Sequence, residues 1–569
     1  MTPEERNRII DNDYFDLIID YNADPSLLNM FKNASINIIN IRYAIVHISY
    51  EDVNNYLGLA VGYSTLPHCY SLTSTVSLET SGVLKVRSTP GLNLQGSGTL
   101  IGIIDTGIDY TNPIFKNNDG TTRIVSIWDQ SIVTEKYPEN FYYGTEYTRG
   151  EINFALHTLD PYSVVPSKDE IGHGTMLAGV AGGKIDISNQ FSGVAPEAEF
   201  VIVKLKDAKQ NVKDFYKIPE DAICYQENDI MLAAKYLYRR AIELKKPIVI
   251  CIGLGSSQGA HDGSDPIEDY LTSLGTNNGV AITVSAGNEG SARRHFFGTI
   301  NKMVGYIDVE LNIAEGESGF TMELWGNTPG IYSINILSPS GEFIPRIPAR
   351  IFENRTISFI MEETRIIILN ALIESLSGDQ LIGIQFQNPS PGIWRFQVFN
   401  SGDMNVGFNV WLPMGDFISG DTYFIRSSPE TTILSPGNGF VPITITAYDP
   451  IANSLYRDAS RGYTRTGETV IVPTIAAPGV NITVPTLEQG FSTGTGTGVA
   501  TAHAAGVAAL LLEWGIVRGN YSRLDSVGIK KLMIKGARRN PNIKYPNRDW
   551  GYGMIDAYNI FTVLRRDLS

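Results

Sequence analysis

Short apolar segments rich in β-branched residues recur along the chain and limit the folds open to it. The first four lie at 99–107, 200–205, 247–255 and 279–290. The segment 229–246, DIMLAAKYLYRRAIELKK, instead repeats its apolar residues at helical spacing. Buried strands that alternate with helices are typical of a parallel sheet with helices on both faces. The sequence therefore predicts a doubly wound α/β domain.

A different pattern interrupts this domain between about 300 and 420. About eight short strand-like segments follow one another there, separated by turns such as SPSGE and NPSPG, with no helical pattern between them. This spacing indicates an antiparallel β-sandwich. The α/β pattern then resumes with VPITITAYD, TVIVPTIAAPG and a helix that begins near Val499. We therefore expect a sandwich at 301–419 inserted into an α/β domain made of 99–300 and 420–569.

The N-terminal residues form a third unit. Strand-like and helical patterns alternate in it, at 16–22, 24–34, 39–49 and 50–60. This alternation predicts a small α+β module at 1–73. A connector rich in Ser, Thr and Gly follows, with the linker proper at 74–98.

The composition excludes several classes of protein. With 43% hydrophobic and 18% charged residues, the chain can build large cores, and general disorder is excluded. A net charge of −15 argues against nucleic acid as a partner. The charged N-terminus lacks a secretory signal, and the apolar stretch Gly506 to Trp514 is shorter than the ~20 residues of a membrane span. We expect a soluble protein made in the cytoplasm, without a membrane span.

Three polar residues stand where strands end or helices begin. Asp105 closes the strand in IGIIDTGID, and Asn288 follows the strand in TVSAGNEG. His173, in IGHGTMLAG, lies at the expected start of a packed helix. Since α/β sheets place their sites at the carboxyl ends of their strands, all three are candidate site residues. Taken singly, each also has a structural explanation, as a turn cap, a packed histidine and a turn residue.

A fourth segment makes the set specific. Residues 494–514, GTGTGVATAHAAGVAALLLEW, form a Gly/Thr loop that leads into an Ala-rich helix. The order Asp…His…Asn…Gly-Thr-x-helix resembles the subtilisin-like serine proteases, peptidase family S8. The preceding segments ASRGYTRTG and IAAPGVNI are also similar to segments of that family. The resemblance covers about 99–300 and 420–565, and it implies the subtilisin-like fold.

The resemblance implies a role for each residue. Asp105 would orient the imidazole of His173, which would act first as general base and then as general acid. Asn288 would stabilise the oxyanion. CIGLGSS and SAGN resemble the two walls of the family's specificity pocket. They imply five substrate-binding residues: Gly253, Leu254, Gly255, Ala286 and Gly287.

The expected nucleophile is missing. The family's motif is Gly-Thr-Ser-x-Ala-x-Pro-His-x-x-Gly, and residues 496–506 read Gly-Thr-Gly-Val-Ala-Thr-Ala-His-Ala-Ala-Gly, which aligns without a gap. Gly498 therefore takes the place of the serine, whose loss costs this family about 10⁶ in rate. We expect none of the neighbouring hydroxyls to replace it: Ser492, Thr497 or Thr501. The chain is thus expected to be inactive, or else to be a working endopeptidase whose serine has been substituted.

The wider organisation resembles the Csp germination proteases of spore-forming clostridia. The shared features are the retained N-terminal module, Ala502 in place of the motif's proline, and the inserted sandwich. The resemblance implies that the module is a prodomain whose tail, HCYSLT at 68–73, ends in the active-site cleft, and that the sandwich is a jelly-roll. Active members cleave the zymogen of a cortex-lytic hydrolase, whereas other members are pseudoproteases that relay germinant signals.

The loss of the serine suggests the second kind of member. We therefore expect a pseudoprotease of the spore that binds a related Csp protease or the cortex-lytic zymogen, with its own uncut prodomain in the cleft. A plain structural scaffold is the weaker alternative. No cofactor is expected: Cys69, Cys224 and Cys251 make neither a disulfide framework nor a metal cluster. Calcium is often bound by subtilisin-like enzymes, but no dense Asp/Asn loop supports a site here.

Overall fold

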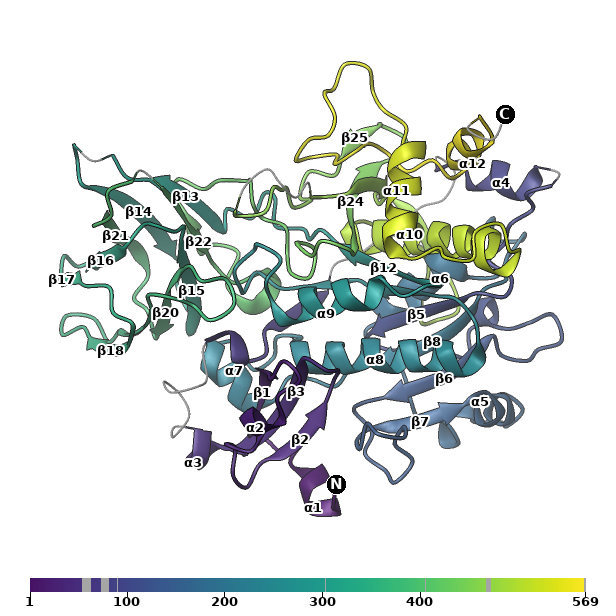
Figure 1. Cartoon of the computed structure of the whole chain (residues 1–569), viewed down its shortest axis with the longest axis horizontal. Helices are drawn as coiled ribbons and strands as arrows, with labels where there is room; N and C mark the ends of the chain where they lie inside the picture. Colours follow the sequence, from purple (N-terminus) through teal and green to yellow (C-terminus); the bar gives the residue numbers. More distant parts are fainter. Residues whose placement is uncertain are drawn as a thin grey trace.

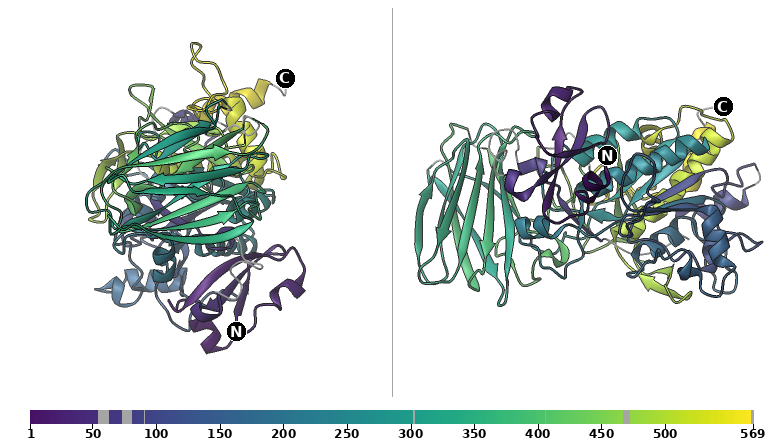
Figure 2. Two further views of the ribbon diagram at one scale, coloured as in Figure 1. Left: turned by 90° about the vertical axis from the view of Figure 1, so that its left-hand side faces the viewer. Right: turned by 90° about the horizontal axis from the view of Figure 1, so that it is seen from below.

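The computed structural model describes residues 1–53, 63–72, 81–89, 91–301, 303–404, 406–466 and 472–566. An α/β domain occupies one end of the molecule and a β-sandwich the other, with the N-terminal module lying against the α/β domain (Figure 1). Figure 2 shows that this module also lies beside the sandwich. A hydrogen bond from Ser64 Oγ to Glu374 Oε1, 2.6 Å long, joins these two units.

The α/β domain is built on a nine-stranded sheet in the order β25-β24-β12-β10-β5-β8-β6-β7, with β26 paired to β24. All pairings are parallel except those of β7 and β25 at the edges. The strands are β5 (Leu100–Asp105), β6 (Ile124–Asp129), β7 (Thr145–Thr148), β8 (Glu199–Lys204), β10 (Ile248–Ile252), β12 (Val280–Ser285), β24 (Ile443–Asp449), β25 (Ser454–Leu455) and β26 (Ile475–Pro478). The predicted parallel α/β fold is confirmed.

Helices cover both faces of this sheet because its strands are apolar on both sides. In β5, Ile101 and Ile103 pack against one helical layer, whereas Leu100 and Ile104 pack against the other. The first layer holds α6 (His173–Gly182), α10 (Thr497–Leu512), α11 (Ser526–Gly536) and α12 (Ala557–Arg566). The second holds α8 (Glu227–Leu244) and α9 (Pro266–Gly275).

Every residue of helix α10 is buried, and a π-helical turn, Glu513–Val517, continues the helix. Among the described residues, Thr497–Val517 is the one helix long and apolar enough to cross a membrane, but 89% of its apolar window is buried inside the protein. It packs against α6 and the sheet, as a core helix does. The Glu513 carboxylate in the π-helical turn accepts the N–H groups of Gln95 and Gly96.

The sandwich consists of two antiparallel sheets, ordered β13-β22-β15-β20-β19-β18 and β17-β16-β21-β14-β23. Its strands are β13 (His295–Thr299), β14 (Tyr306–Ile313), β15 (Gly319–Gly326), β16 (Tyr332–Leu337), β17 (Phe343–Ile347), β18 (Phe352–Ser358), β19 (Arg365–Ala371), β20 (Gln380–Gln387), β21 (Gly392–Asn400), β22 (Gly407–Trp411) and β23 (Tyr423–Phe424). Apolar side chains from both sheets meet in one buried cluster. The strands extend past the expected 301–419 because β13 pairs with β22 and β23 with β14.

The N-terminal module is a three-stranded antiparallel sheet in the order β1-β3-β2. Its elements are α1 (Pro3–Asn7), β1 (Tyr14–Asp20), α2 (Pro25–Leu28), β2 (Ser35–Ile38), β3 (Tyr43–Ser49) and α3 (Tyr50–Val53). One face of the sheet packs against α8 and α9, since Ile18, Tyr43 and Ile45 share a buried cluster with these helices. The expected helix at 24–34 is reduced to α2, and most of the one at 50–60 lies outside the described residues.

Candidate active site

Asp105 and His173 meet where β5 ends and α6 begins. His173 Nδ1 lies 2.7 Å from Asp105 Oδ1, and both side chains are buried. Since a carboxylate only accepts, the imidazole carries its hydrogen on Nδ1. The close approach requires glycine at 174, because a Cβ there would lie 2.2 Å from the carbonyl oxygen of Gly107. The strand end and the helix start are thus packed directly together.

Asp169 positions this pair, and sequence reasoning missed it. One of its carboxylate oxygens accepts from the Thr106 hydroxyl at 2.7 Å, and the other accepts from the Thr175 hydroxyl, also at 2.7 Å. Thr106 Oγ1 in turn accepts the N–H of Gly174, at 2.9 Å. Asp169 is buried and lies four residues before His173 in KDEIGH, a local signal that could have identified it.

Asn288 is bonded to the start of α10, next to Gly498. Its Oδ1 accepts the N–H and the hydroxyl of Thr497, each at 3.1 Å, while Thr497 Oγ1 accepts the N–H of Gly287. Because Oδ1 accepts both bonds, the NH₂ group of the Asn288 side chain is left to donate hydrogen bonds. Gly498 is the second residue of α10 and is buried. β5 and β12 flank β10 in the sheet. The Asp105–His173 pair and the Asn288–Thr497 pair therefore lie at the carboxyl edge of the same sheet.

The hydroxyls nearest to Gly498 in sequence are held elsewhere. Thr497 Oγ1 donates to Asn288, and Thr501 Oγ1 donates to the carbonyl of Thr497 at 2.7 Å. Ser492 lies on β28 (Phe491–Gly494), which pairs with β27 (Ile482–Pro485) in a separate two-stranded sheet. Each of the three alternatives to the missing serine thus has a position set by other bonds.

The tail of the N-terminal module lies beside these residues as a strand. β4 (Cys69–Leu72) is the central strand between β11 (Leu254–Gly255) and β9 (Tyr225–Gln226). Leu72 pairs with Leu254, and Cys69 with Gln226, both antiparallel. A Cβ added to Gly253, the residue before β11, would lie 3.3 Å from His173 Cε1. Because β4 pairs antiparallel with β11, β4 runs toward the imidazole. Residue 73, the last of the expected tail, lies outside the described residues.

The two expected walls of the specificity pocket face each other across Leu434, a residue that the sequence analysis missed. A Cβ on Gly255 would lie 2.7 Å from Leu434 Cδ1, and one on Gly287 would lie 2.5 Å from Leu434 Cγ. The backbone N–H of Leu434 donates to the Ala286 carbonyl at 3.0 Å. Leu434 thereby occupies the space between the two walls.

No group of three or more His, Cys, Asp or Glu side chains in the described ranges could hold a metal ion. Cys69, Cys224 and Cys251 are buried free thiols. The chemistry at the sheet edge is therefore an imidazole held by a carboxylate, an amide donor and the start of a long helix, which attracts negative charge.

Comparisons with known proteins agree with this geometry. A sequence model of the subtilase family matches residues 96–313 and 409–553, leaving most of the sandwich unmatched. The solved structure of the Clostridium perfringens CspB protease is 31% identical, with a TM-score of 0.76, over 86% of this chain and 97% of that one.

Two curated relatives are more distant. A subtilisin of Bacillus sp. (strain TA39) is 26% identical over 34% of this chain and 35% of its own length. The subtilisin-like protease SBT3.17 of Arabidopsis thaliana is 24% identical over 74% of this chain and 54% of its own length. The chain thus spans between about a third and about half of the length of these relatives.

Proposed function

This chain belongs to the subtilase family, and on that premise we propose that it is a pseudoprotease that works by binding. One observation carries the proposal: Gly498 stands at the start of α10, beside the Asn288–Thr497 hydrogen bonds, where the family requires a serine. Without a hydroxyl, no acyl-enzyme can form, and only the modest catalysis of the oxyanion donors would remain.

The N-terminal module is proposed to be an uncut prodomain. Its tail is hydrogen-bonded on both edges within the cleft, and its sheet is packed on α8 and α9. Asp16 of β1 lies in the same interface, 2.8 Å from Lys209 Nζ and 2.6 Å from His47 Nδ1. Burial alone would raise the pKa of Asp16, but Lys209 and His47 outweigh burial and hold it below its usual range. The module therefore stays attached by covalent and by buried ionic links.

The proposed biological setting rests on the likeness to the CspB protease, which is 31% identical to this chain with a TM-score of 0.76. We propose that the protein acts in spore germination and binds either a related Csp protease or the zymogen of a cortex-lytic hydrolase. Its location would then be the spore.

Restoring the nucleophile tests the proposal. The Gly498→Ser chain and a matched Gly498→Ala chain are purified in full length beside the unaltered one. We expect an N-terminal fragment ending near Thr73 only in the Gly498→Ser chain, with the other two remaining single chains. Covalent labelling of the unaltered chain by a fluorophosphonate would overturn the pseudoprotease proposal.

A working endopeptidase whose serine has been substituted is the second candidate. The intact Asp105–His173 contact favours it, since such a contact serves acid–base catalysis. Cleavage of added peptides by Gly498→Ser at rates typical of enzymes, about 1–10³ per second, would support it. Self-cleavage alone, with no turnover of added peptide, would favour a binding role.

A further inference from the structure

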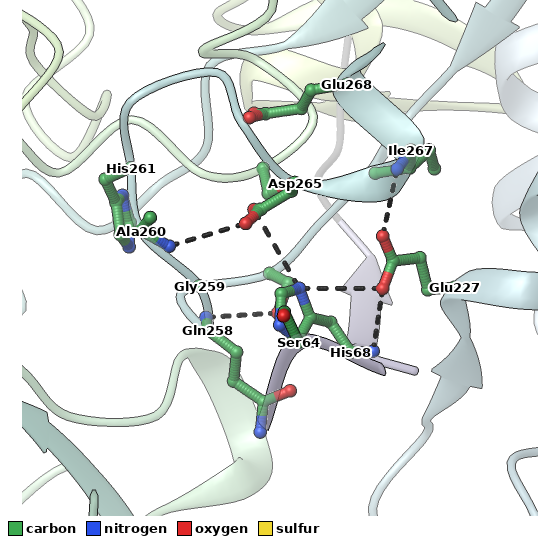
Figure 3. A network of polar contacts seen from close by, with 12 residues as sticks. Ser64, His68, Glu227, Gln258, Gly259, Ala260, His261, Asp265, Ile267 and Glu268 are labelled. Atoms are coloured by element: carbon green, nitrogen blue, oxygen red, sulfur yellow. Dashed lines mark hydrogen bonds and ion pairs between the residues drawn. The ribbon is translucent and has the colours of Figure 1, made fainter. Parts of the chain in front are cut away.

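The tail begins with a histidine that is buried among carboxylates. His68 is 1% exposed, and its Nδ1 lies 3.6 Å from Glu227 Oε2 and 3.8 Å from Asp265 Oδ2. Figure 3 shows the imidazole pointing between these two side chains. Glu227 opens α8 and Asp265 precedes α9, so both carboxylates belong to the α/β domain, whereas the histidine belongs to the tail. We call Glu227 and Asp265 the acidic subsite.

The subsite is built to hold a side chain against the tail backbone. Glu227 Oε2 accepts the backbone N–H of His68 at 3.0 Å, and its Oε1 accepts the N–H of Ile267 at 3.0 Å. Gly259 forms one wall: a Cβ there would lie 2.5 Å from Asp265 Oδ2 and 2.8 Å from His68 Cε1. Its φ of 98° suits glycine as well. The absence of a side chain at Gly259 thus leaves room for the side chain of His68.

This region holds more acid than the histidine can neutralise. Asp265 Oδ2 is buried without a hydrogen-bond donor, and Glu323 of β15 and Glu374 of the sandwich are buried close enough to act on His68. Burial would lower the pKa of His68, but Glu227 and these other carboxylates raise it. Burial also raises the pKa of Asp265 to about 7. Among the described residues, His68 is the one basic group within ion-pair distance of Glu227 or Asp265.

A second pocket fixes the spacing along the tail. Tyr70, two residues after His68, is completely buried, and its hydroxyl lies 3.1 Å from Ser435 Oγ. Alternate residues of a strand point to the same side. The side chains of His68 and Tyr70 therefore occupy two adjacent pockets on one side of the tail.

We infer that Glu227 and Asp265 form a cation-selecting subsite of the peptide cleft. It favours a segment that carries a basic side chain two residues before an aromatic one. His68 and Tyr70 of the tail occupy these positions in the resting protein. A lysine or arginine, whose charge does not depend on a raised pKa, satisfies the carboxylates better than histidine. The inference rests on the proposed function in one respect, namely that a partner's segment binds this cleft in place of the tail.

The test compares peptides on a full-length chain whose tail no longer supplies the cation, His68→Gln. Two fluorescent peptides copy 66–73 with serine in place of Cys69, one carrying arginine and the other glutamine in place of His68. Fluorescence polarisation is expected to show on the order of 30-fold tighter binding of the arginine peptide. The tethered tail competes equally with both peptides, so the ratio is unaffected by it.

Adding Asp265→Asn should reduce this ratio to a few-fold, whereas the control Glu243→Gln, at an exposed carboxylate of α8, should leave it unchanged. Equal binding of the two peptides, or a ratio that survives Asp265→Asn, would overturn the inference. If neither peptide displaces the tail, hydrogen exchange at 69–72 is compared between His68→Arg and His68→Gln. Slower exchange in the arginine chain is then expected, and equal exchange would count against the subsite.

These binding ratios involve no catalysis, so they separate the two proposals. Fluorophosphonate labelling would overturn the pseudoprotease proposal but would not affect the preference for the arginine peptide over the glutamine peptide. Loss of the charge preference would remove the subsite while leaving Gly498 and its consequences unchanged.

Discussion

Replacing Asp16 by alanine would strip one buried carboxylate from the interface between the module and the α/β domain. Asp16 is fully buried and accepts from Lys209 Nζ at 2.8 Å and from Gln226 Nε2 at 3.1 Å. After its removal, the acceptors left to the Lys209 ammonium within the described part of the chain are the carbonyl oxygens of Arg8 and Tyr14. Breaking a buried pair in this way costs about 3–5 kcal/mol, because an uncompensated charge remains.

The loss should be local and measurable by hydrogen exchange. In Asp16→Ala, amides of β1 and β3 are expected to exchange faster by the equivalent of about 3 kcal/mol, with α10 unchanged. Asp20→Asn is the matched control on the same strand, since Asp20 pairs with the half-exposed Arg42 at 2.8 Å. Such a pair is worth about 0–1 kcal/mol. Equal exchange in the two variants would refute the assignment of the buried pair as the main ionic link.

The same link predicts a pH dependence. The pKa of Asp16 lies below its usual range in the folded chain, so its contribution is complete above the unfolded value of about 3.9. The contribution declines as the pH falls below that value toward the folded pKa. The free energy of opening of β1, taken from exchange rates corrected for the intrinsic pH dependence of amide exchange, should therefore fall in acid more steeply in the unaltered chain than in Asp16→Ala. Parallel pH profiles would contradict this prediction.

Three further outcomes are expected. In the Gly498→Ser chain, adding Asp105→Asn should lower the rate of self-cleavage on the order of 10⁴-fold, because the imidazole loses its orienting carboxylate. Gel electrophoresis over time measures this rate. Leu434→Ala in that chain should admit larger side chains before the cleaved bond, read out with a peptide library, at a stability cost of about 2–5 kcal/mol. Gly259→Ala should accelerate proteolysis of the tail, because the added Cβ meets Asp265 Oδ2 at 2.5 Å and the residue has a positive φ; an unchanged cleavage rate would contradict the tight wall.

Much of the fold could be predicted because its signals are local. The apolar strand that ends at Asp105 and the strand before Asn288 are each recognisable from a few residues, and an α/β sheet places their ends together. Leu434 escaped prediction because it acts through contacts with distant segments, whereas Asp169 could have been found from its place four residues before His173.

The acidic subsite shows the same limit more sharply. Glu227 and Asp265 lie at the starts of two separate helices, and the histidine between them comes from the N-terminal tail. Each acidic residue reads as an ordinary first-turn or capping residue in its own segment. Only the docking of the tail as a strand brings the three together, and no local pattern encodes that docking.

The pairing of β13 with β22 bears on the order of assembly. β12 and β24 are parallel neighbours, Thr283 opposite Ile443, although the whole sandwich separates them in sequence. Because Thr299 pairs with Gly407, a sandwich that has already folded holds its two ends together. The remaining loop between β12 and β24 is then short, and the entropic barrier to joining them falls. Weakening the β13–β22 pairing should slow refolding of the α/β sheet while leaving its final stability nearly unchanged. The inserted sandwich would then set the folding rate of a domain to which it does not belong.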